Sequence, residues 1–402
     1  MKILITGASL TGNKGASAMC ISVIKALRVN YGSKVKVGLL SPKPDLDKPM
    51  SDDLNIKLFS YGGVLRKSIP NYFLVSIFKK RFIKNDPVYD GYLWADLIID
   101  IHGINFSDSG TLTSHAIIPS AQIFLAYLLS TPLVKFTQTF GPMERLNIRI
   151  MAKIFLPLVA NIFPREESAH QCLDALHLKN LEKVYVDSAF LLPSKLPKLL
   201  AGNIPESKGK RIAFVPNAIL LSKTKNYIKV CKTLISQIIN QGHTPVIIMH
   251  YSRPTTDEAL LNKSSNNDYQ LVQDLVVDFN NLEMYVEEYS SSELKGIIST
   301  CDLAVPSRYH ALVASISQSI PSFCVGWAGK YEGLLGKVGM SDFSFTADSE
   351  GYFDVENISK NFLIFLKKYS NDLSKIDSNV LDLRQECSDS YERLFEIIDS
   401  HE

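Results

Sequence analysis

Residues 302–325 of this 402-residue chain read DLAVPSRYHALVASISQSIPSFCV. Within this stretch, residues 302–305 predict a short buried strand, and residues 311–319 predict a helix of small and apolar side chains. Residues 322–325 predict the next strand. A strand, a helix and a second strand in this order indicate a parallel sheet with crossover helices, which places the chain in the α/β class.

Three polar residues, Ser307, Arg308 and His310, lie where the first of these strands ends and the helix begins. Ligands of α/β proteins bind at this carboxyl edge of the sheet. A helix N-terminus favours an anion, so an arginine there is unfavourable unless an anion is present. Arg308 could hold a phosphate or carboxylate through paired hydrogen bonds, and Lys330, after the second strand, could add a point charge. A salt bridge for Arg308 and a capping or packing role for His310 are the structural alternatives.

The alternation of strands and helices extends through most of the chain and is interrupted once. Residues 193–210 contain three prolines, two glycines and four lysines, and this composition is typical of an interdomain linker. We therefore expect two Rossmann-like domains facing a cleft, a GT-B-like architecture. The expected parts are an N-terminal domain, a linker, a C-terminal domain and a last helix crossing back to the N-terminal domain, over residues 1–193, 194–210, 211–375 and 376–402.

The predicted elements follow one another in this order along both halves. The further predicted strands span residues 2–5, 34–40, 98–101, 133–137, 211–215, 245–249 and 282–286. One further predicted helix ends near residue 29, and four others span residues 117–134, 226–241, 269–279 and 291–300.

The bulk composition excludes several classes of protein. The chain is 46% hydrophobic and 21% charged with a net charge of +2, so it gives no argument for a nucleic-acid partner. Its six cysteines are never closer than 23 residues, which argues against a zinc site and fits a reducing compartment. The sequence shows no signal peptide and no transmembrane helix, so we expect a cytoplasmic protein.

The first half has two candidate site segments. Asp100 and His102 end an apolar strand, and residues two apart on a strand point to the same side. They could bind sugar hydroxyls or act as acid and base, or they could only cap a loop. The loop around Asn13, Lys14 and Gly15 lacks the spacing of a dinucleotide fingerprint or a P-loop, so anion or sugar binding and a plain tight turn both stay open.

Residues 66–84 combine six basic side chains with aromatic and aliphatic ones. Such a stretch could rest on an anionic membrane surface at the inner face of the membrane, near a lipid-linked acceptor. The alternative, a buried helix face with a solvated basic end, is favoured because the apolar positions are what any buried helix needs.

Five short motifs together resemble the polysaccharide pyruvyl transferase family. The strongest is the C-terminal Ser-Arg-x-His-Ala pattern, followed by a Pro-led strand and Lys-Tyr-Glu at residues 330–332. The other four are GNKGASAM at residues 12–19, QTFGP at 138–142, REES at 165–168 and DSAF at 187–190. The chain departs from the family at Gly15-Ala16, where many members have Gly-Asp, and at His102-Gly103-Ile104, where many have three glycines.

The resemblance implies transfer of the enolpyruvyl group of phosphoenolpyruvate onto a sugar of a surface polysaccharide or its lipid-linked precursor, without cofactor or metal. It implies His310 and Arg308 as catalytic residues. The implied donor-binding residues are Arg165, Ser307, Arg308, His310 and Lys330. The expected acceptor-binding residues are Asn13, Lys14, Gly15, Asp100 and His102.

Two alternatives from other classes remain at the level of sequence. One is a GT-B glycosyltransferase, in which the same cationic edge would hold the diphosphate of a nucleotide sugar. The other is a non-catalytic carbohydrate-binding relative, which the lost triple glycine would suit.

Overall fold

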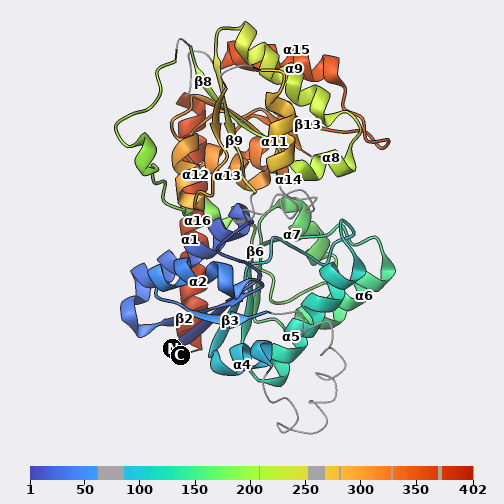
Figure 1. Ribbon diagram of the computed structural model, residues 1–402. Coiled ribbons are helices and arrows are strands. Elements are labelled where there is room, and N and C mark those ends of the chain that lie inside the picture. Colours follow the sequence, from blue (N-terminus) through green and yellow to red (C-terminus); the bar gives the residue numbers. More distant parts are fainter. Residues whose placement is uncertain are drawn as a thin grey trace. The chain divides into compact units, whose positions relative to one another are not determined.

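The structure is a computed structural model that describes residues 1–61, 86–207, 209–251, 268–279, 282–326, 329–369 and 374–401 (Figure 1). The basic-aromatic stretch 66–84, with its predicted membrane contact, lies outside the described residues. The chain forms two compact units. The first comprises Met1–Leu10, Met19–Ser188 and Glu386–Glu402, and the second comprises Thr11–Ala18 and Ala189–Gln385.

The first unit is built on a parallel sheet whose strand order is β3-β2-β1-β4-β6-β5, with β7 also pairing with β6. Every strand pair in it is parallel, as crossover connections require. The strands are β1 (Lys2–Thr6), β2 (Lys36–Ser41), β3 (Lys57–Ser60), β4 (Leu97–Asp100), β5 (Ile104–Asn105), β6 (Leu133–Phe140) and β7 (Asn161–Pro164).

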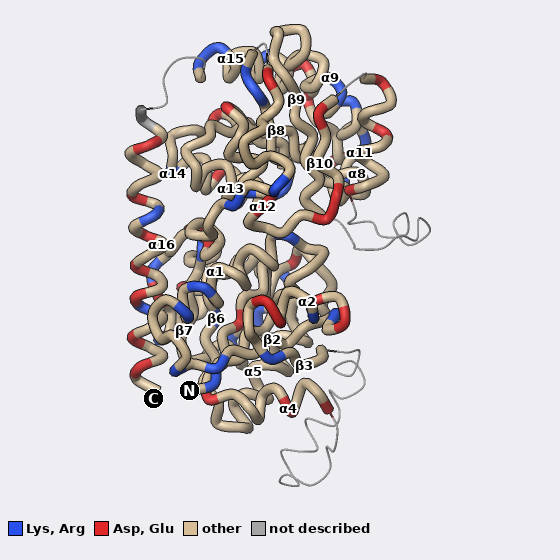
Figure 2. The backbone as a smooth tube through the Cα atoms, turned by 60° about the vertical axis from the view of Figure 1, so that its left-hand side comes forward, with Lys and Arg blue, Asp and Glu red and all other residues tan. Residues whose placement is uncertain are grey.

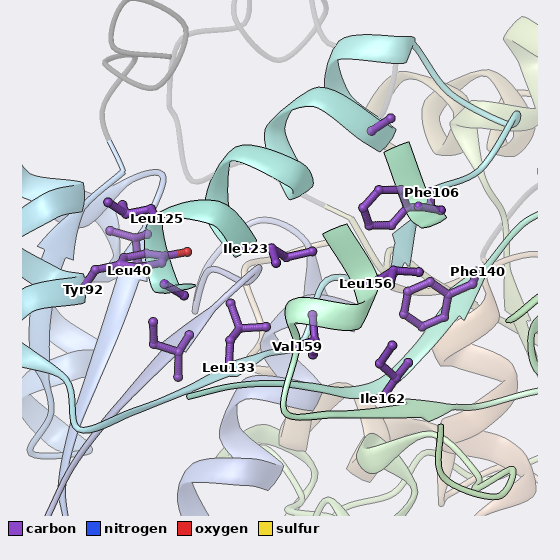
Figure 3. Close-up of a cluster of buried hydrophobic side chains, with 14 of the residues drawn as sticks. Leu40, Tyr92, Phe106, Ile123, Leu125, Leu133, Phe140, Leu156, Val159 and Ile162 are labelled. Carbon is purple, nitrogen blue, oxygen red and sulfur yellow. The ribbon is translucent and has the colours of Figure 1, made fainter. Parts of the chain in front are cut away.

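One face of this sheet packs against helices in a large apolar core (Figure 3). Leu133 and Ile162 from the strands meet Ile123 and Leu156 from the covering segments, and each is nearly fully buried. Burying one such side chain contributes roughly 1.5–3 kcal/mol, so this face supplies much of the unit's stability. The helices on this side are α4 (Pro87–Trp94), α5 (Ile118–Leu128), α6 (Leu146–Phe155) and α7 (Glu167–Asp174).

Two long helices contribute to the first unit: α1 (Lys14–Tyr31) and the C-terminal part of α16 (Ser374–Ser400). The ring of Tyr391 lies 5.3 Å from that of Phe136 on β6, and its hydroxyl donates to Ser22 Oγ at 3.0 Å. Buried residues recur along α16 at spacings of three and four, and acidic and basic residues occupy much of the rest of it (Figure 2). This amphipathic pattern explains why so charged a segment is a well-packed helix.

The second unit is built on a parallel sheet with the order β10-β9-β8-β11. The strands are β8 (Arg211–Val215), β9 (Thr244–Ile248), β10 (Glu283–Tyr285) and β11 (Leu303–Pro306). The predicted strand 322–325 corresponds to β12 (Cys324–Gly326), which pairs with β13 (Ser344–Thr346) in a separate two-stranded sheet. An isolated bridge between Ala304 and Ser322 joins this segment to β11.

Helices flank the second sheet and form its core. Residues of α12 (Ser291–Ile298) and α13 (Tyr309–Ile316) pack with strand residues of β8, β9 and β11 in one cluster. That cluster includes Leu200 of the predicted linker, which is 2% exposed, so the linker packs onto the second unit at this residue. The remaining helices are α2 (Pro44–Asp53) in the first unit and α8 (Ala218–Lys223), α9 (Tyr227–Asn240), α11 (Tyr269–Val276), α14 (Lys330–Lys337) and α15 (Val355–Lys368) in the second.

The two parallel sheets confirm the predicted α/β class. The segment Thr11–Ala18, which we call the N-terminal loop, consists of a short loop and the first residues of α1. It groups with the second unit, although the sequence analysis placed it in the first domain, because Asn13 bridges to Tyr251 beyond the end of β9. Among the described residues, no helix is both long enough and apolar enough to span a membrane.

Candidate functional site

The carboxyl edge of the second sheet gathers most of the predicted site residues. Strand β11 ends at Pro306 and helix α13 begins at Tyr309, so Ser307 and Arg308 form the turn between them. Strand β9 ends at Ile248 and is followed by His250, which is 6% exposed. These positions agree with the expectation that polar residues follow parallel strands at their ligand-binding edge.

Arg308 is held by a buried carboxylate that the sequence analysis missed. Its Nε donates to Asp268 Oδ2 at 2.6 Å, and its Nη2 donates to Asp268 Oδ1. Asp268 is fully buried and also accepts from the backbone N–H groups of Ala218 and Tyr251, both at 2.9 Å. The anion that an arginine needs at a helix start is therefore supplied by the protein. The pairing fixes the plane of the guanidinium, whose side chain remains 11% exposed.

His310 lies one residue into helix α13, against the N-terminal loop. A Cβ atom at Gly15 would overlap the His310 ring, so position 15 must be glycine for the loop to approach so closely. The His310 ring also packs edge-on against Tyr309, with centroids 5.5 Å apart. The Lys330 ammonium lies 5.0 Å from the centroid of the same Tyr309 ring. One aromatic side chain thus contacts two of the predicted donor-binding residues.

The N-terminal loop belongs to this same edge. Asn13 forms an antiparallel bridge with Tyr251, and Ser291 Oγ donates to the Lys14 carbonyl at 2.8 Å. The Lys14 side chain is only 2% exposed, and its ammonium pairs with the Glu288 carboxylate. Asn13, Lys14 and Gly15 were expected to bind the acceptor in the first domain. The structure instead groups them with Arg308 and His310 in the second unit.

Burial and the positive charges gathered at this edge lower the pKa of His250. Burial lowers the pKa of its imidazole well below the usual value, and the charges of Arg308, His310 and Lys14 lower that pKa further. His250 is therefore neutral at physiological pH, and several cationic groups act on one small region. Such a region favours an anion.

Ser307 serves the local fold in addition to any ligand. It is 2% exposed, and its carbonyl accepts from Asn217 Nδ2 at 2.9 Å and from the Tyr331 hydroxyl at 3.2 Å. These two hydrogen bonds tie the turn to the segment after β8 and to α14, which holds Arg308 and His310 in place.

The first unit carries a second polar cluster at the end of β4. Asp100 Oδ1 lies 2.6 Å from His102 Nδ1, and Lys135 Nζ donates to Asp100 Oδ2 at 2.6 Å. Burial by itself would raise the pKa of Asp100, but the charges and hydrogen bonds of Lys135 and His102 hold that pKa far below its usual range. An ionised Asp100 only accepts hydrogen bonds, so His102 Nδ1 is the donor and Nε2 is the nitrogen left to exchange a proton.

The pairing of β4 with β6 makes this cluster possible. Asp100 and Lys135 are register partners in that pairing, so the Lys135 ammonium reaches the Asp100 carboxylate. The register of β6 against β7 shifts between Lys135 and Gln138, and Gln138 donates to the Asp100 carbonyl. Thr137, between them, has a φ of +45°, a value that is uncommon for a β-branched residue. No period-two pattern could have predicted Lys135 as a partner of Asp100.

Arg165 was expected to contribute to donor binding, and the structure gives it partners within the protein. Its side chain is 1% exposed and lies in the first unit. Its nitrogens donate to Asp187 Oδ2 at 2.6 Å, to Thr139 Oγ1 at 2.8 Å and to the Gly103 carbonyl at 3.0 Å. Its Nε also lies 3.4 Å from Glu166 Oε2, and the bond to the Gly103 carbonyl fixes the loop that follows His102.

The predicted residues therefore form two groups. Asn13, Lys14, Gly15, Ser307, Arg308, His310 and Lys330 belong to the second unit, and Asp100, His102 and Arg165 belong to the first. Asp268, Glu288 and Lys135 are the partners that sequence reasoning missed. Within the described parts of the chain, no three His, Cys, Asp or Glu side chains are placed to share a metal ion.

Two α/β units, each built on a parallel sheet with polar residues at its carboxyl edge, define a GT-B-like protein. Solved structures share this fold. UDP-GlcNAc 2-epimerase from Neisseria meningitidis, bound to UDP-GlcNAc, has a TM-score of 0.61 at 12% identity, covering 98% of this chain and 100% of that one. The Methanocaldococcus jannaschii UDP-GlcNAc 2-epimerase has a TM-score of 0.56 at 10% identity, covering 92% and 93%. The glycosyltransferase SnogD from Streptomyces nogalater has a TM-score of 0.50 at 14% identity, covering 100% and 99%. At such identities these likenesses concern the fold alone.

The sequence itself is more specific than the fold. Residues 13–329 match the polysaccharide pyruvyl transferase family, a span that includes the Asp100 cluster, the Arg308 turn and most of the N-terminal loop. The chain belongs to this family, as its five motifs predicted. No curated protein matches the chain.

Proposed function

We propose that this protein transfers the enolpyruvyl group of phosphoenolpyruvate onto a sugar of a surface polysaccharide or its lipid-linked precursor, and forms a pyruvate ketal with release of phosphate. The observation that carries the proposal is the convergence of Lys14, Arg308 and His310 on one sheet edge, inside the span that matches the family. Phosphoenolpyruvate carries a phosphate and a carboxylate, so a site for it needs several cationic donors.

The reaction places a specific demand on His310. The methylene carbon of phosphoenolpyruvate takes up a proton, which gives the adjacent carbon positive character and allows a sugar hydroxyl to attack it. Phosphate then leaves, and a second hydroxyl closes the ketal. Of the two hydroxyl protons released, one balances the proton taken up by the methylene and the other departs with phosphate. An imidazole titrates in the range where such exchange is fast at neutral pH, so we assign the proton transfer at the donor to His310.

Arg308 and Lys330 would hold the anionic groups of the donor. The guanidinium of Arg308 has a fixed orientation because Asp268 accepts from two of its nitrogens. A fixed guanidinium loses less conformational entropy when it binds a second anion. Lys330 would act as a point charge on phosphate.

We assign activation of the acceptor hydroxyl to His102. With Asp100 ionised and accepting from Nδ1, the Nε2 lone pair can take a hydroxyl proton, in the manner of an aspartate-oriented histidine base. Asp100 itself is 1% exposed, so it would orient His102 rather than bind the sugar. Neither assignment requires a cofactor.

Phosphate release tests the proposal directly. Purified protein would be incubated with phosphoenolpyruvate and a panel of saccharides, with free phosphate and the pyruvate ketal followed by NMR. His102→Ala should impair acceptor use more than phosphoenolpyruvate binding, and His310→Ala should remove turnover with every acceptor. Release of a nucleoside diphosphate from a nucleotide sugar, with no phosphate from phosphoenolpyruvate, would refute pyruvyl transfer in favour of glycosyl transfer. Saccharide binding without any turnover would indicate a carbohydrate-binding relative.

A further inference from the structure

Lys14 is a buried cation whose partner is accessible. Its side chain is 2% exposed, whereas that of Glu288, which pairs with its ammonium, is 34% exposed. Both residues belong to the second unit. Glu288 lies between β10 and the Ser290 cap of α12, so the anion of this pair sits on a connecting segment rather than inside a strand or helix.

The backbone around Lys14 is fixed from several directions. Asn13 bridges to Tyr251, the Lys14 carbonyl accepts from Ser291, and Gly15 packs on the His310 ring. Because the main chain is held in this way, the Lys14 ammonium stays close to the start of α13, which carries His310. The loss of one partner would therefore not allow Lys14 to move out into water.

Asp268 and Glu288 both pair with cations at this edge, and they differ in accessibility. Asp268 is fully buried and accepts from two backbone N–H groups as well as from Arg308, so it is part of the fold. Glu288 is accessible and pairs with Lys14. A ligand anion can replace an accessible side-chain carboxylate far more easily than a buried one, because the displaced group returns to water.

We propose that Glu288 is a displaceable counter-ion of Lys14, and that the phosphate or carboxylate of the incoming donor takes its place on the Lys14 ammonium. This inference rests on the proposed function for the identity of the donor. It assigns Lys14 to the donor site, beside Arg308 and His310, and makes Glu288 a competitor that sets donor affinity.

Electrostatics favours the exchange because it keeps Lys14 paired throughout. An unpaired buried ammonium is costly, so Lys14 requires an anion whether or not the donor is bound. Phosphoenolpyruvate carries more negative charge than one carboxylate and brings it to all the cations of the edge. Displacing Glu288 from Lys14 nevertheless makes the net binding free energy of phosphoenolpyruvate less favourable. Removing that competition should tighten binding about three- to tenfold, the equivalent of a partly exposed ion pair.

Calorimetric titration of the full chain with inorganic phosphate, and then with phosphoenolpyruvate, measures this competition without turnover. Glu288→Gln should bind both anions about three- to tenfold more tightly than the unaltered protein. Glu287→Gln is the matched control, because it removes the same charge from the neighbouring exposed residue, and its affinity should stay within about twofold. In a Lys14→Met background, phosphate binding should be weaker and Glu288→Gln should give no gain.

Equal or weaker phosphate binding by Glu288→Gln would overturn the inference, as would an equal gain in Glu287→Gln. If Glu288→Gln fails to fold, Glu288→Asp carries the test: its shorter side chain keeps the charge but pairs less well, so it should also bind phosphate more tightly. Turnover of phosphoenolpyruvate with no affinity change in these variants would refute the inference and leave the proposed function standing. Tighter phosphate binding without turnover of phosphoenolpyruvate would support the exchange of Glu288 for an anion and refute the proposed function.

Discussion

Replacing Lys135 by methionine should destabilise the first unit, because the substitution removes one partner of an ion pair that is shielded from water on both sides. The side chains of Lys135 and Asp100 are 0% and 1% exposed, and Nζ lies 2.6 Å from Oδ2. Removing one partner of such a pair costs about 3–5 kcal/mol, since the other charge stays buried. Methionine has a similar volume, so loss of packing adds little.

Guanidinium denaturation followed by tryptophan fluorescence measures this loss in the correct unit. The sequence contains two tryptophans, and Trp94 lies in α4 of the first unit. In a Trp327→Phe background, Trp94 therefore reports unfolding of the first unit alone. With a denaturant slope of about 4 kcal/mol per molar, the transition should shift by about 1 M. Lys153→Met, an exposed lysine on α6, is the control and should change stability by less than about 0.5 kcal/mol.

A second substitution separates the effect of leaving the Asp100 charge unpaired from the other effects of Lys135→Met. In an Asp100→Asn background no buried carboxylate is left unpaired, so Lys135→Met should cost far less than in the unaltered protein. If Lys135→Met alone costs less than about 1 kcal/mol, Asp100 is not an ion in the folded protein. The assignment of His102 as an aspartate-oriented base would then fail with it.

Three further outcomes follow from the two sites. His310→Ala should lower turnover of phosphoenolpyruvate by about 10²–10⁴-fold with unchanged circular dichroism, and near-normal turnover would remove His310 from the mechanism. Arg308→Lys should raise the Michaelis constant for phosphoenolpyruvate and lower the free energy of unfolding by about 1–3 kcal/mol. The reason is that lysine cannot reproduce the paired hydrogen bonds to Asp268. An unchanged Michaelis constant would place the guanidinium away from the donor. The pKa of Asp100 is lowered from 3.8 in the fold, so its stabilisation is fully present above that pH and is lost as the pH falls below it. The stability deficit of Asp100→Asn, measured by denaturation at a series of pH values, should therefore be constant near neutrality and shrink below about pH 4, and a deficit that persists in acid would contradict the ion-pair account.

Local sequence patterns specified the elements and the edge at which the site lies. The predicted strand 211–215 is β8 residue for residue, and Ser307 and Arg308 fall in the turn between β11 and α13, with His310 in the first turn of α13. Apolar runs bounded by polar residues specify short buried strands, and small apolar residues specify the next helix. The family motifs are equally local, since each is a short run of neighbouring residues, and the family could therefore be identified from the chain alone.

Which charges meet depends on tertiary folding. Arg308 and Asp268 are 40 residues apart in the chain, Lys135 and Asp100 are 35 apart, and Lys14 and Glu288 are 274 apart. Each pairing depends on how separate strands are ordered and aligned in a sheet, or on the packing of the N-terminal loop at the second sheet's edge. A local sequence pattern carries no information about such distant partners. A buried charge nevertheless requires one, because leaving it unpaired costs several kcal/mol, on the order of a protein's whole stability.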